Sequence, residues 1–388
     1  MFSNNDQISA RQIKRLLLFD MFGASSLLLP AQLAKAGTGI GLWSLMAGIG
    51  LAGVYLWILY SCFRRAPQDY MIYLSQGWGS FLTKIFFLCY AGISVAVCAW
   101  AANLLSEVMC ESLLENRDFP IALLLILLLA LYGGIAGLEA RARIYELLFW
   151  VLVIPLAFML LLCIRQVQVI QWFPLSGRAG SDGAGLFWRG AWMSFASFLP
   201  LTFLVFLVPH VQNKKRAGKA ATAAFLFSAA ALVAIYLILL GIFGQGALAR
   251  EEYAIITLLG MVKIPGDFVK RLDAVMVGVW FFTLYALTGT ALYYGVTILR
   301  KAATGRAEKG NAKSRRQNRV QRRWFFAVTA VVYGVAYLFH VFPNTERIAC
   351  RLFYTIGIPF LVLLPAISVF LCPNRKIKQR RDEMQEHA

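Results

Sequence analysis

Charged side chains are scarce in this sequence of 388 residues. Asp, Glu, Lys and Arg together make up 15% of it, against 60% for the hydrophobic residues. A water-soluble domain needs a polar surface around its core, and this composition cannot supply one. The shortage of charge therefore excludes an ordinary soluble protein and indicates a chain that lies within a membrane.

Residues that bind metals or carry out catalysis are also few. The three histidines lie far apart, and the seven cysteines form no CxxC pair, so neither a metal centre nor another cofactor is expected. The sequence contains no GxSxG, no GxxxxGK[ST] and no HExxH. No His/Asp pair lies in a predicted span near an interface, and we do not expect an enzyme.

Long apolar runs recur along the whole chain. A helix needs roughly 20 apolar residues to cross the hydrocarbon core of a bilayer. Irregular backbone and open sheet edges leave polar groups unsatisfied in lipid, so we predict an all-α integral membrane protein with one membrane domain, residues 1–388. The ten predicted membrane-spanning helices lie near residues 13–33, 40–62, 81–109, 120–136, 144–164, 186–209, 220–243, 274–299, 324–342 and 352–372.

Basic residues outnumber acidic ones by 38 to 19 and are unevenly placed. With a cytoplasmic N-terminus, most of them fall on the cytoplasmic side of the ten spans, as the positive-inside rule requires. Both termini are therefore expected to be cytoplasmic. The longest basic segment, residues 300–323, has no interleaved aromatic residues. It is typical of a loop held near anionic lipid headgroups, or of a docking site, rather than of a nucleic-acid-binding arm.

Two of the ten spans contain residues that weaken a helix. The first carries LFDMFGASSLLLP (18–30), and the sixth carries the similar FASFLP (195–200). Five helices separate the two segments, which reverses their direction across the membrane. This arrangement predicts a 5+5 inverted repeat, 13–164 and 186–372, with helices 1 and 6 interrupted. The alternative is that the small residues only allow neighbouring helices to pack closely.

An interrupted helix would create a binding site. Unwinding frees N–H and C=O groups that must face a cavity, where they attract a carboxylate, an ammonium group or a cation. A small zwitterion such as an amino acid presents charges of both signs. The two interrupted helices therefore indicate a pocket for a small charged molecule.

Several polar residues within the predicted spans are candidates for coupling. Asp20 could carry a proton or cation, or pair with nearby arginines at the interface. Glu146 has the same two interpretations, with Arg143 three residues away on one helix face. In the eighth span the hydroxyls of Tyr285 and Thr288 could hold a ligand or a cation, or bond to a carbonyl one turn back.

The order of short motifs along nearly the whole chain resembles one family, the B subunits of spore germinant receptors (GerAB-like spore permeases) of the amino acid–polyamine–organocation superfamily. The matching motifs are Ile8-Ser9…Gln12, Gly23…Leu29-Pro30, Ala36-Gly37…Trp43, Gly137-Leu138-Glu139…Arg143…Glu146, Phe173-Pro174, His210…Lys214-Lys215 and Arg271-Leu272-Asp273.

This resemblance implies a LeuT-like fold whose central pocket holds a nutrient germinant, often an amino acid. It also implies A-type and C-type partner subunits and a place in the spore inner membrane. Carried onto this chain, the implied ligand-binding residues are Gly23, Ala24, Ser25, Ser26, Ser194, Ala196 and Ser197, to which the polar pattern adds Tyr285 and Thr288.

Two functions fit these expectations. The first is a nutrient-sensing receptor subunit, in which the ligand shifts a conformational equilibrium that partner subunits read. The second is a secondary amino acid transporter, coupled to H⁺ or Na⁺ through Asp20 or Glu146. Both use the same fold and pocket, and the fold alone does not decide between them.

Overall fold

The chain is described here by a computed structural model that covers residues 7–36, 38–66, 69–112, 118–172, 183–211, 213–261, 272–304 and 315–372. All regular secondary structure in these ranges is helical. The prediction of an all-α fold is confirmed. The motif residues Gly37, Phe173, Pro174 and Arg271 lie outside the described ranges.

Thirteen α-helices and four shorter helical turns make up the described chain. The first five helices are α1 Ala10–Ala34, α2 Thr38–Arg65, α3 Tyr70–Ser112, α4 Phe119–Ala136 and α5 Leu138–Ile164, followed by the turn η1 Val169–Trp172. The middle of the chain forms α6 Gly183–Ala196, η2 Leu199–Thr202, α7 Phe203–Phe206, η3 Val208–His210, α8 Lys214–Leu248 and α9 Ala254–Met261. The last part forms α10 Leu272–Thr304, α11 Arg315–Val341, α12 Pro343–Leu352, η4 Phe353–Gly357 and α13 Ile358–Leu371.

The described residues contain nine helices that are long and apolar enough to cross a membrane. The bent pair α6 and η2–α7 adds a tenth span when it is counted as one. This agrees with the ten predicted spans, because each long apolar run forms a helix that satisfies its own backbone groups.

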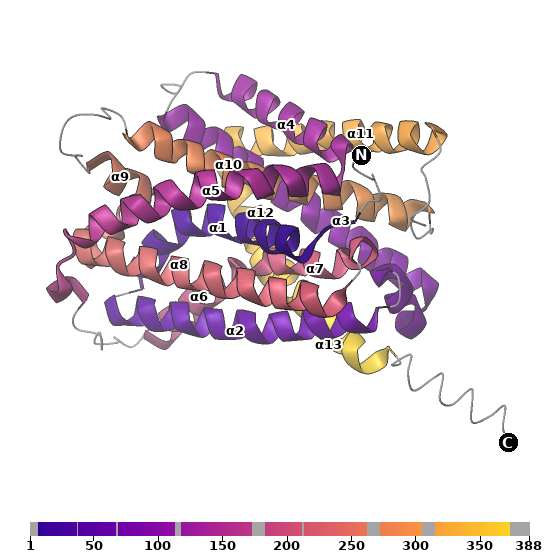
Figure 1. Ribbon diagram of the computed structural model, residues 1–388, viewed down its shortest axis with the longest axis horizontal. Coiled ribbons are helices and arrows are strands. Elements are labelled where there is room, and N and C mark those ends of the chain that lie inside the picture. The colour runs from indigo at the N-terminus through magenta and orange to yellow at the C-terminus, as the bar shows by residue number, and fades with distance from the viewer. Residues whose placement is uncertain are drawn as a thin grey trace.

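Helices α1 and α10 form the centre of the bundle. In each of them, 83% of the most apolar stretch is buried, a larger share than in any other span. Figure 1 shows α1 running through the middle of the molecule, with α5 and α10 on one side and α8 and α2 on the other. Because α1 contacts all of these helices, the polar residues it carries lie deep inside the protein.

The prediction that the first helix is interrupted is wrong, since α1 is a continuous helix. The Ser25 hydroxyl donates to the Met21 carbonyl, and the Ser26 hydroxyl donates to the Gly23 carbonyl at 3.0 Å. Hydroxyls that bond back one turn in this way are satisfied without unwinding the helix. Pro30 lies in the last turns, where it removes one backbone hydrogen bond and leaves the rest of the helix intact.

The prediction that the sixth span is interrupted is confirmed. Helix α6 ends at Ala196, and after a two-residue break the chain continues in η2 and α7 at an angle of 46°. Pro200 explains the position of the break, because it has no N–H to donate to the Ala196 carbonyl and its ring clashes with that group. The Phe198 N–H instead closes a tight turn onto the Phe195 carbonyl at 3.0 Å.

Both ends of the predicted basic loop, residues 300–323, are helical in the described residues. Helix α10 continues to Thr304 and α11 begins at Arg315, whereas residues 305–314 lie outside the described ranges. Lys and Arg favour helical backbone, so both helices extend past their apolar parts into the basic region. For the same reason α5 begins at Leu138, which places Arg141, Arg143 and Glu146 on its first turns rather than in or beside a loop.

Candidate functional site

A cavity of about 380 Å³ lies between α1, α3, α10 and the broken segment α6–η2–α7, and is closed on another side by α12, η4 and α13. Its volume lies at the low end of the range for small-molecule sites, about 300–1,000 Å³. Most of its wall is aliphatic or aromatic. The polar side chains in the wall include Asp20, Ser25, Gln32, Ser94, Ser197, Thr202 and Tyr354.

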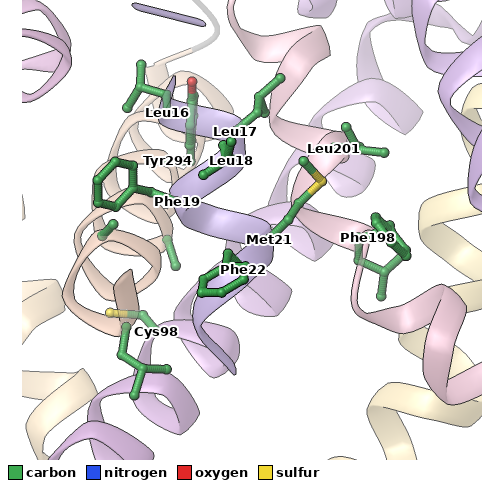
Figure 2. Close-up of a cluster of buried hydrophobic side chains, with 14 of the residues drawn as sticks. Leu16, Leu17, Leu18, Phe19, Met21, Phe22, Cys98, Phe198, Leu201 and Tyr294 are labelled. Atoms are coloured by element: carbon green, nitrogen blue, oxygen red, sulfur yellow. The ribbon is translucent and has the colours of Figure 1, made fainter. Parts of the chain in front are cut away.

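One side of the cavity is formed by α1, which presents Asp20, Met21, Ala24 and Ser25. These residues recur every three or four positions, so they share one helix face. The Ser25 hydroxyl donates its hydrogen to α1 itself, so its oxygen can only accept a further hydrogen bond. Figure 2 shows Met21 reaching from α1 toward the broken segment.

The opposite side is formed by the break in the sixth span. Ala196 and Ser197 line the cavity at the end of α6, and Pro200 lines it just beyond the break. The Tyr55 hydroxyl lies 2.6 Å from the Thr202 hydroxyl and fixes the start of the second half against α2. The structure therefore brings Ala24 and Ser25 together with Ala196 and Ser197 around one cavity, as the sequence predicted.

Asp20 belongs to a buried polar chain that joins three helices. The Thr290 hydroxyl on α10 donates to the Asp20 Oδ1 atom at 2.8 Å. Arg141 on α5 donates in turn to the Thr290 hydroxyl, while its Nη1 atom is buried and has no hydrogen-bond partner among the described residues. Asp20 and Arg141 are each 3% exposed. A carboxyl group and a guanidinium group are thus buried, with one hydroxyl between them.

Five of the predicted ligand-binding residues do not line the cavity. Gly23 faces α10, where a Cβ atom would come within 2.8 Å of the Thr283 hydroxyl oxygen. Ser26 accepts a hydrogen bond from the buried Trp280 indole at 2.9 Å. Ser194 packs against Gly48 of α2. At Gly23 and Ser194 the alternative interpretation, close helix packing, describes what the structure contains.

The hydroxyls of the eighth span also turn away from the cavity. Tyr285 donates to the Leu129 carbonyl of α4 at 3.0 Å. Thr288 donates to the Leu284 carbonyl of its own helix at 2.9 Å. Thr288 therefore bonds to a carbonyl one turn back, which was the alternative to holding a ligand or a cation.

Glu146 lies away from the cavity, at the end of α1 that carries its first residues. Its carboxylate is paired with Arg11 at 2.5 Å and with Arg15 at 3.3 Å, and it accepts a hydrogen bond from Gln12 at 3.2 Å. Arg143, the partner suggested by spacing, pairs instead with Glu139. The ion pair at Glu146 therefore joins α5 to α1 rather than two turns of α5.

Two features of the site were missed by sequence reasoning. The sequence patterns singled out neither Arg141, which reaches Asp20 through Thr290, nor Trp100, which lines the cavity. The spacing of Glu139, Arg141 and Arg143 carried a usable signal. Alternate positions on a helix point to different faces, so only some of these charges can reach the solvent.

Comparison with known proteins decides the family. A family model described as spore germination protein, the spore permease family, matches residues 7–306. The chain belongs to this family of spore germination permeases. The permease is 23% identical to spore germination protein A2 of Bacillus subtilis (strain 168) over 287 residues, which cover 72% of this chain and 76% of that protein.

Two further relatives of the permease come from the same organism. Spore germination protein B2 is 22% identical over 273 residues, 67% of this chain and 70% of that protein. Spore germination protein YndE is 22% identical over 291 residues, 74% of this chain and 78% of that protein.

Among solved structures, the permease is similar in fold to a Na⁺-coupled sialic acid symporter in a substrate-bound outward-open state. The TM-score is 0.69 and the identity 12%, over 95% of this chain and 80% of the symporter. At this identity the likeness establishes the fold, and it confirms the expected LeuT-like architecture. The spore permease is therefore an integral membrane protein of receptor or permease type.

Proposed function

We propose that this permease is the nutrient-sensing subunit of a spore germination receptor. A small molecule, amino acid-like in its size and polar groups, would bind the cavity between α1 and the broken sixth span. The observation that carries the proposal is the cavity itself, with Ala24 and Ser25 on one wall and Ala196 and Ser197 on the other. The break makes one wall of the cavity from two short pieces that meet at an angle of 46°.

The proposal assigns supporting roles to the predicted residues outside the cavity. Gly23 and Ser26 would fix α1 against α10, and Ser194 would fix α6 against α2. Tyr285 would fix α10 against α4, and the Thr288 hydroxyl would stay bonded within α10. In this arrangement a ligand that moves the broken span also moves the helices that hold α1, which is how occupancy would reach partner subunits.

The proposal extends to the location and partners of the protein. We infer that it lies in the spore inner membrane with both termini cytoplasmic, and that it acts with A-type and C-type receptor subunits. The uneven distribution of Lys and Arg along the sequence supports this orientation. The membership of the chain in the spore germination family supports the receptor assembly.

Cys350 offers a direct test of ligand binding, because its side chain lines the cavity. The full chain in lipid nanodiscs would be treated with N-ethylmaleimide in the presence of each common amino acid, and modification of each cysteine would be followed by peptide mass spectrometry. We expect at least one amino acid to slow modification of Cys350, by about tenfold at ten times its Kd. Cys89, which is exposed and lies outside the cavity, is the internal control. If none of the amino acids slows the modification of Cys350 by N-ethylmaleimide, the proposal is contradicted.

A secondary transporter is the second candidate, since a Na⁺-coupled symporter has the same fold. In this reading Asp20 is the better candidate for coupling, because Glu146 is held by Arg11 and Arg15 while Asp20 lines the cavity. Proteoliposomes containing only this chain would be loaded with the amino acid that protects Cys350 and tested for counterflow of its radiolabelled form. Binding without counterflow supports the sensor, and counterflow supports the transporter.

A further inference from the structure

The wall of the cavity carries charge of one sign. Asp20 is its only residue of the Asp, Glu, Lys, Arg and His types, so no basic side chain of the described residues lines it. Arg141 reaches Asp20 through the Thr290 hydroxyl rather than directly, which leaves Arg141 outside the cavity wall. A ligand in this cavity therefore meets a carboxyl group but no cationic side chain.

The neutral polar groups of the wall point to the same ligand chemistry. The hydroxyl hydrogens of three lining serines are donated to backbone carbonyls: Ser25 to Met21, Ser94 to Ala291 at 2.8 Å, and Ser197 to Met193 at 3.4 Å. A hydroxyl that has donated its hydrogen retains two acceptor lone pairs. These serines thus offer acceptors to a ligand, whereas the Gln32 amide and the hydroxyls of Tyr90 and Tyr354 can also donate.

Helix α1 does not offer the free backbone N–H donors that an interrupted helix would have. Its backbone is continuous through Asp20, Ala24 and Ser25, so the amide groups there are bonded within the helix. Free N–H groups at a break in this helix were the expected partner for a ligand carboxylate. The described α1 has no such free N–H groups, so a ligand carboxylate would find no backbone donor on this side of the cavity.

A cluster of glutamates beside the lining residue Trp100 adds further acidic groups near the cavity. Trp100, which lines the cavity, donates a hydrogen bond to Glu346 of α12. Glu107 lies one to two turns beyond Trp100 on α3, and the charges of Glu111, Glu252 and Glu346 all act on it. An acidic cluster of this kind attracts cations and repels anions.

Two basic groups and one buried amide also belong to this cluster. The positive charge of Arg347 attracts the Glu346 carboxylate. The His340 Nδ1 atom lies 3.9 Å from the Glu107 Oε1 atom. Asn103 donates to Glu107 at 2.9 Å, and its buried Oδ1 atom has no partner among the described residues. The four glutamates of this cluster outnumber its two basic groups, which leaves a surplus of carboxyl groups and of acceptors.

We propose that the cavity recognises a ligand by its ammonium group, which binds Asp20, and that the ligand's body is apolar and needs no carboxylate. This inference rests on the proposed function and names its ligand class, a primary amine or an amino acid read through its amine. An ammonium group brings three donors and a positive charge, which match the acceptors and the single carboxyl group of the wall. The aliphatic and aromatic remainder of the wall would bury the rest of the molecule.

The test compares three probes that differ at one end only. L-leucine carries both charges, L-leucinamide lacks the carboxylate, and N-acetyl-L-leucine lacks the ammonium group. Protection of Cys350 would be titrated with each probe on the full chain in nanodiscs. We expect L-leucinamide to bind at least as tightly as L-leucine, and N-acetyl-L-leucine to bind about 10- to 100-fold more weakly. Equal binding of N-acetyl-L-leucine, or no binding of L-leucinamide, overturns the inference.

Variants place the recognition at Asp20. We expect Asp20→Asn to weaken L-leucinamide about 10- to 100-fold and to leave N-acetyl-L-leucine unchanged. Asp118→Asn is the matched control, since Asp118 is exposed, caps α4 without a side-chain hydrogen bond and lies outside the cavity. Unchanged binding of L-leucinamide to a folded Asp20→Asn protein would overturn the assignment, and the three-probe comparison on the unmodified chain does not depend on that variant.

The two proposals fail in different ways. If N-acetyl-L-leucine protects Cys350 as well as L-leucinamide does, the cavity binds small molecules but does not read the amine, so only the inference fails. If neither the amino acids nor L-leucinamide protect Cys350, the cavity is not a nutrient site, and the proposed function fails with it.

Discussion

Gly23 illustrates how one residue type can serve packing rather than binding. Its position on α1 faces α10, and a Cβ atom there would lie 2.8 Å from the Thr283 hydroxyl oxygen and 3.0 Å from the backbone of Leu284. Backbone atoms cannot move aside as the end of a flexible side chain can. The absence of a side chain at Gly23 therefore sets how closely the two central helices approach.

Replacement of Gly23 by Ala tests this role. The added methyl group overpacks the contact between α1 and α10, and we expect a loss of about 1–3 kcal/mol in the free energy of unfolding. Thermal unfolding of the purified protein in nanodiscs measures it. Gly92→Ala is the control, since a Cβ atom on Gly92 of α3 has no neighbour within 4 Å. If both variants melt at the temperature of the original protein, Gly23 is not a packing residue.

At the scale of the element, the two proline-containing spans predicted to be interrupted behave differently. Pro30 is close to the end of α1, which stays helical. Pro200 lies in the middle of the sixth span, and α6 ends at the residue whose carbonyl would have accepted its hydrogen bond, Ala196. The serines near Pro30 satisfy their hydroxyls on their own helix, so polar character alone does not produce a break.

Pro200→Ala tests whether the break shapes the site. Alanine restores an N–H that can bond to the Ala196 carbonyl, and a proline inside a helix costs about 3 kcal/mol, so the helical form gains by a similar amount. We expect the span to straighten and the binding of L-leucinamide to weaken about tenfold or more. Binding would be measured by the protection of Cys350 from N-ethylmaleimide.

Pro155→Ala provides the matched comparison for this experiment. Pro155 lies inside α5, which is continuous, and it does not line the cavity. We expect Pro155→Ala to leave L-leucinamide binding unchanged. An equal loss in both variants would mean that the effect comes from general changes in helix packing rather than from the break.

At the scale of the whole molecule, charge placement sets the orientation in the bilayer. The ends of α10 and α11 that meet the basic segment lie on the same side as the start of α1 when the spans alternate. Lys301 at this side forms a buried ion pair with Asp69, at 2.6 Å, and so ties α10 to the start of α3. Basic residues and their partners thus gather on the side that we propose to be cytoplasmic.

The orientation can be measured with single cysteines. The native cysteines would first be replaced, and one cysteine would be introduced at position 2 or at position 387. Each is expected to react with a membrane-impermeant thiol reagent only after the cells are permeabilised. A cysteine at Asp118, on the opposite side, is expected to react in intact cells. Labelling of position 2 or 387 in intact cells would contradict cytoplasmic termini.

The sequence alone predicted the fold class, the ten spans and the break in the sixth of them. It did so because the cost of exposing polar backbone in lipid acts on every apolar run in the same way, and because the effect of Pro200 on the Ala196 carbonyl is local. It also predicted four of the residues that line the cavity, Ala24, Ser25, Ala196 and Ser197.

Only the tertiary structure decided which face of each helix meets the cavity. Gly23 and Ser25 are two residues apart on α1, yet one packs against α10 and the other faces the cavity, because successive residues of a helix point in different directions. The pairing of Asp20 with Thr290 and Arg141 joins residues that are up to 270 positions apart. No local pattern encodes such contacts, since they depend on how three helices pack together.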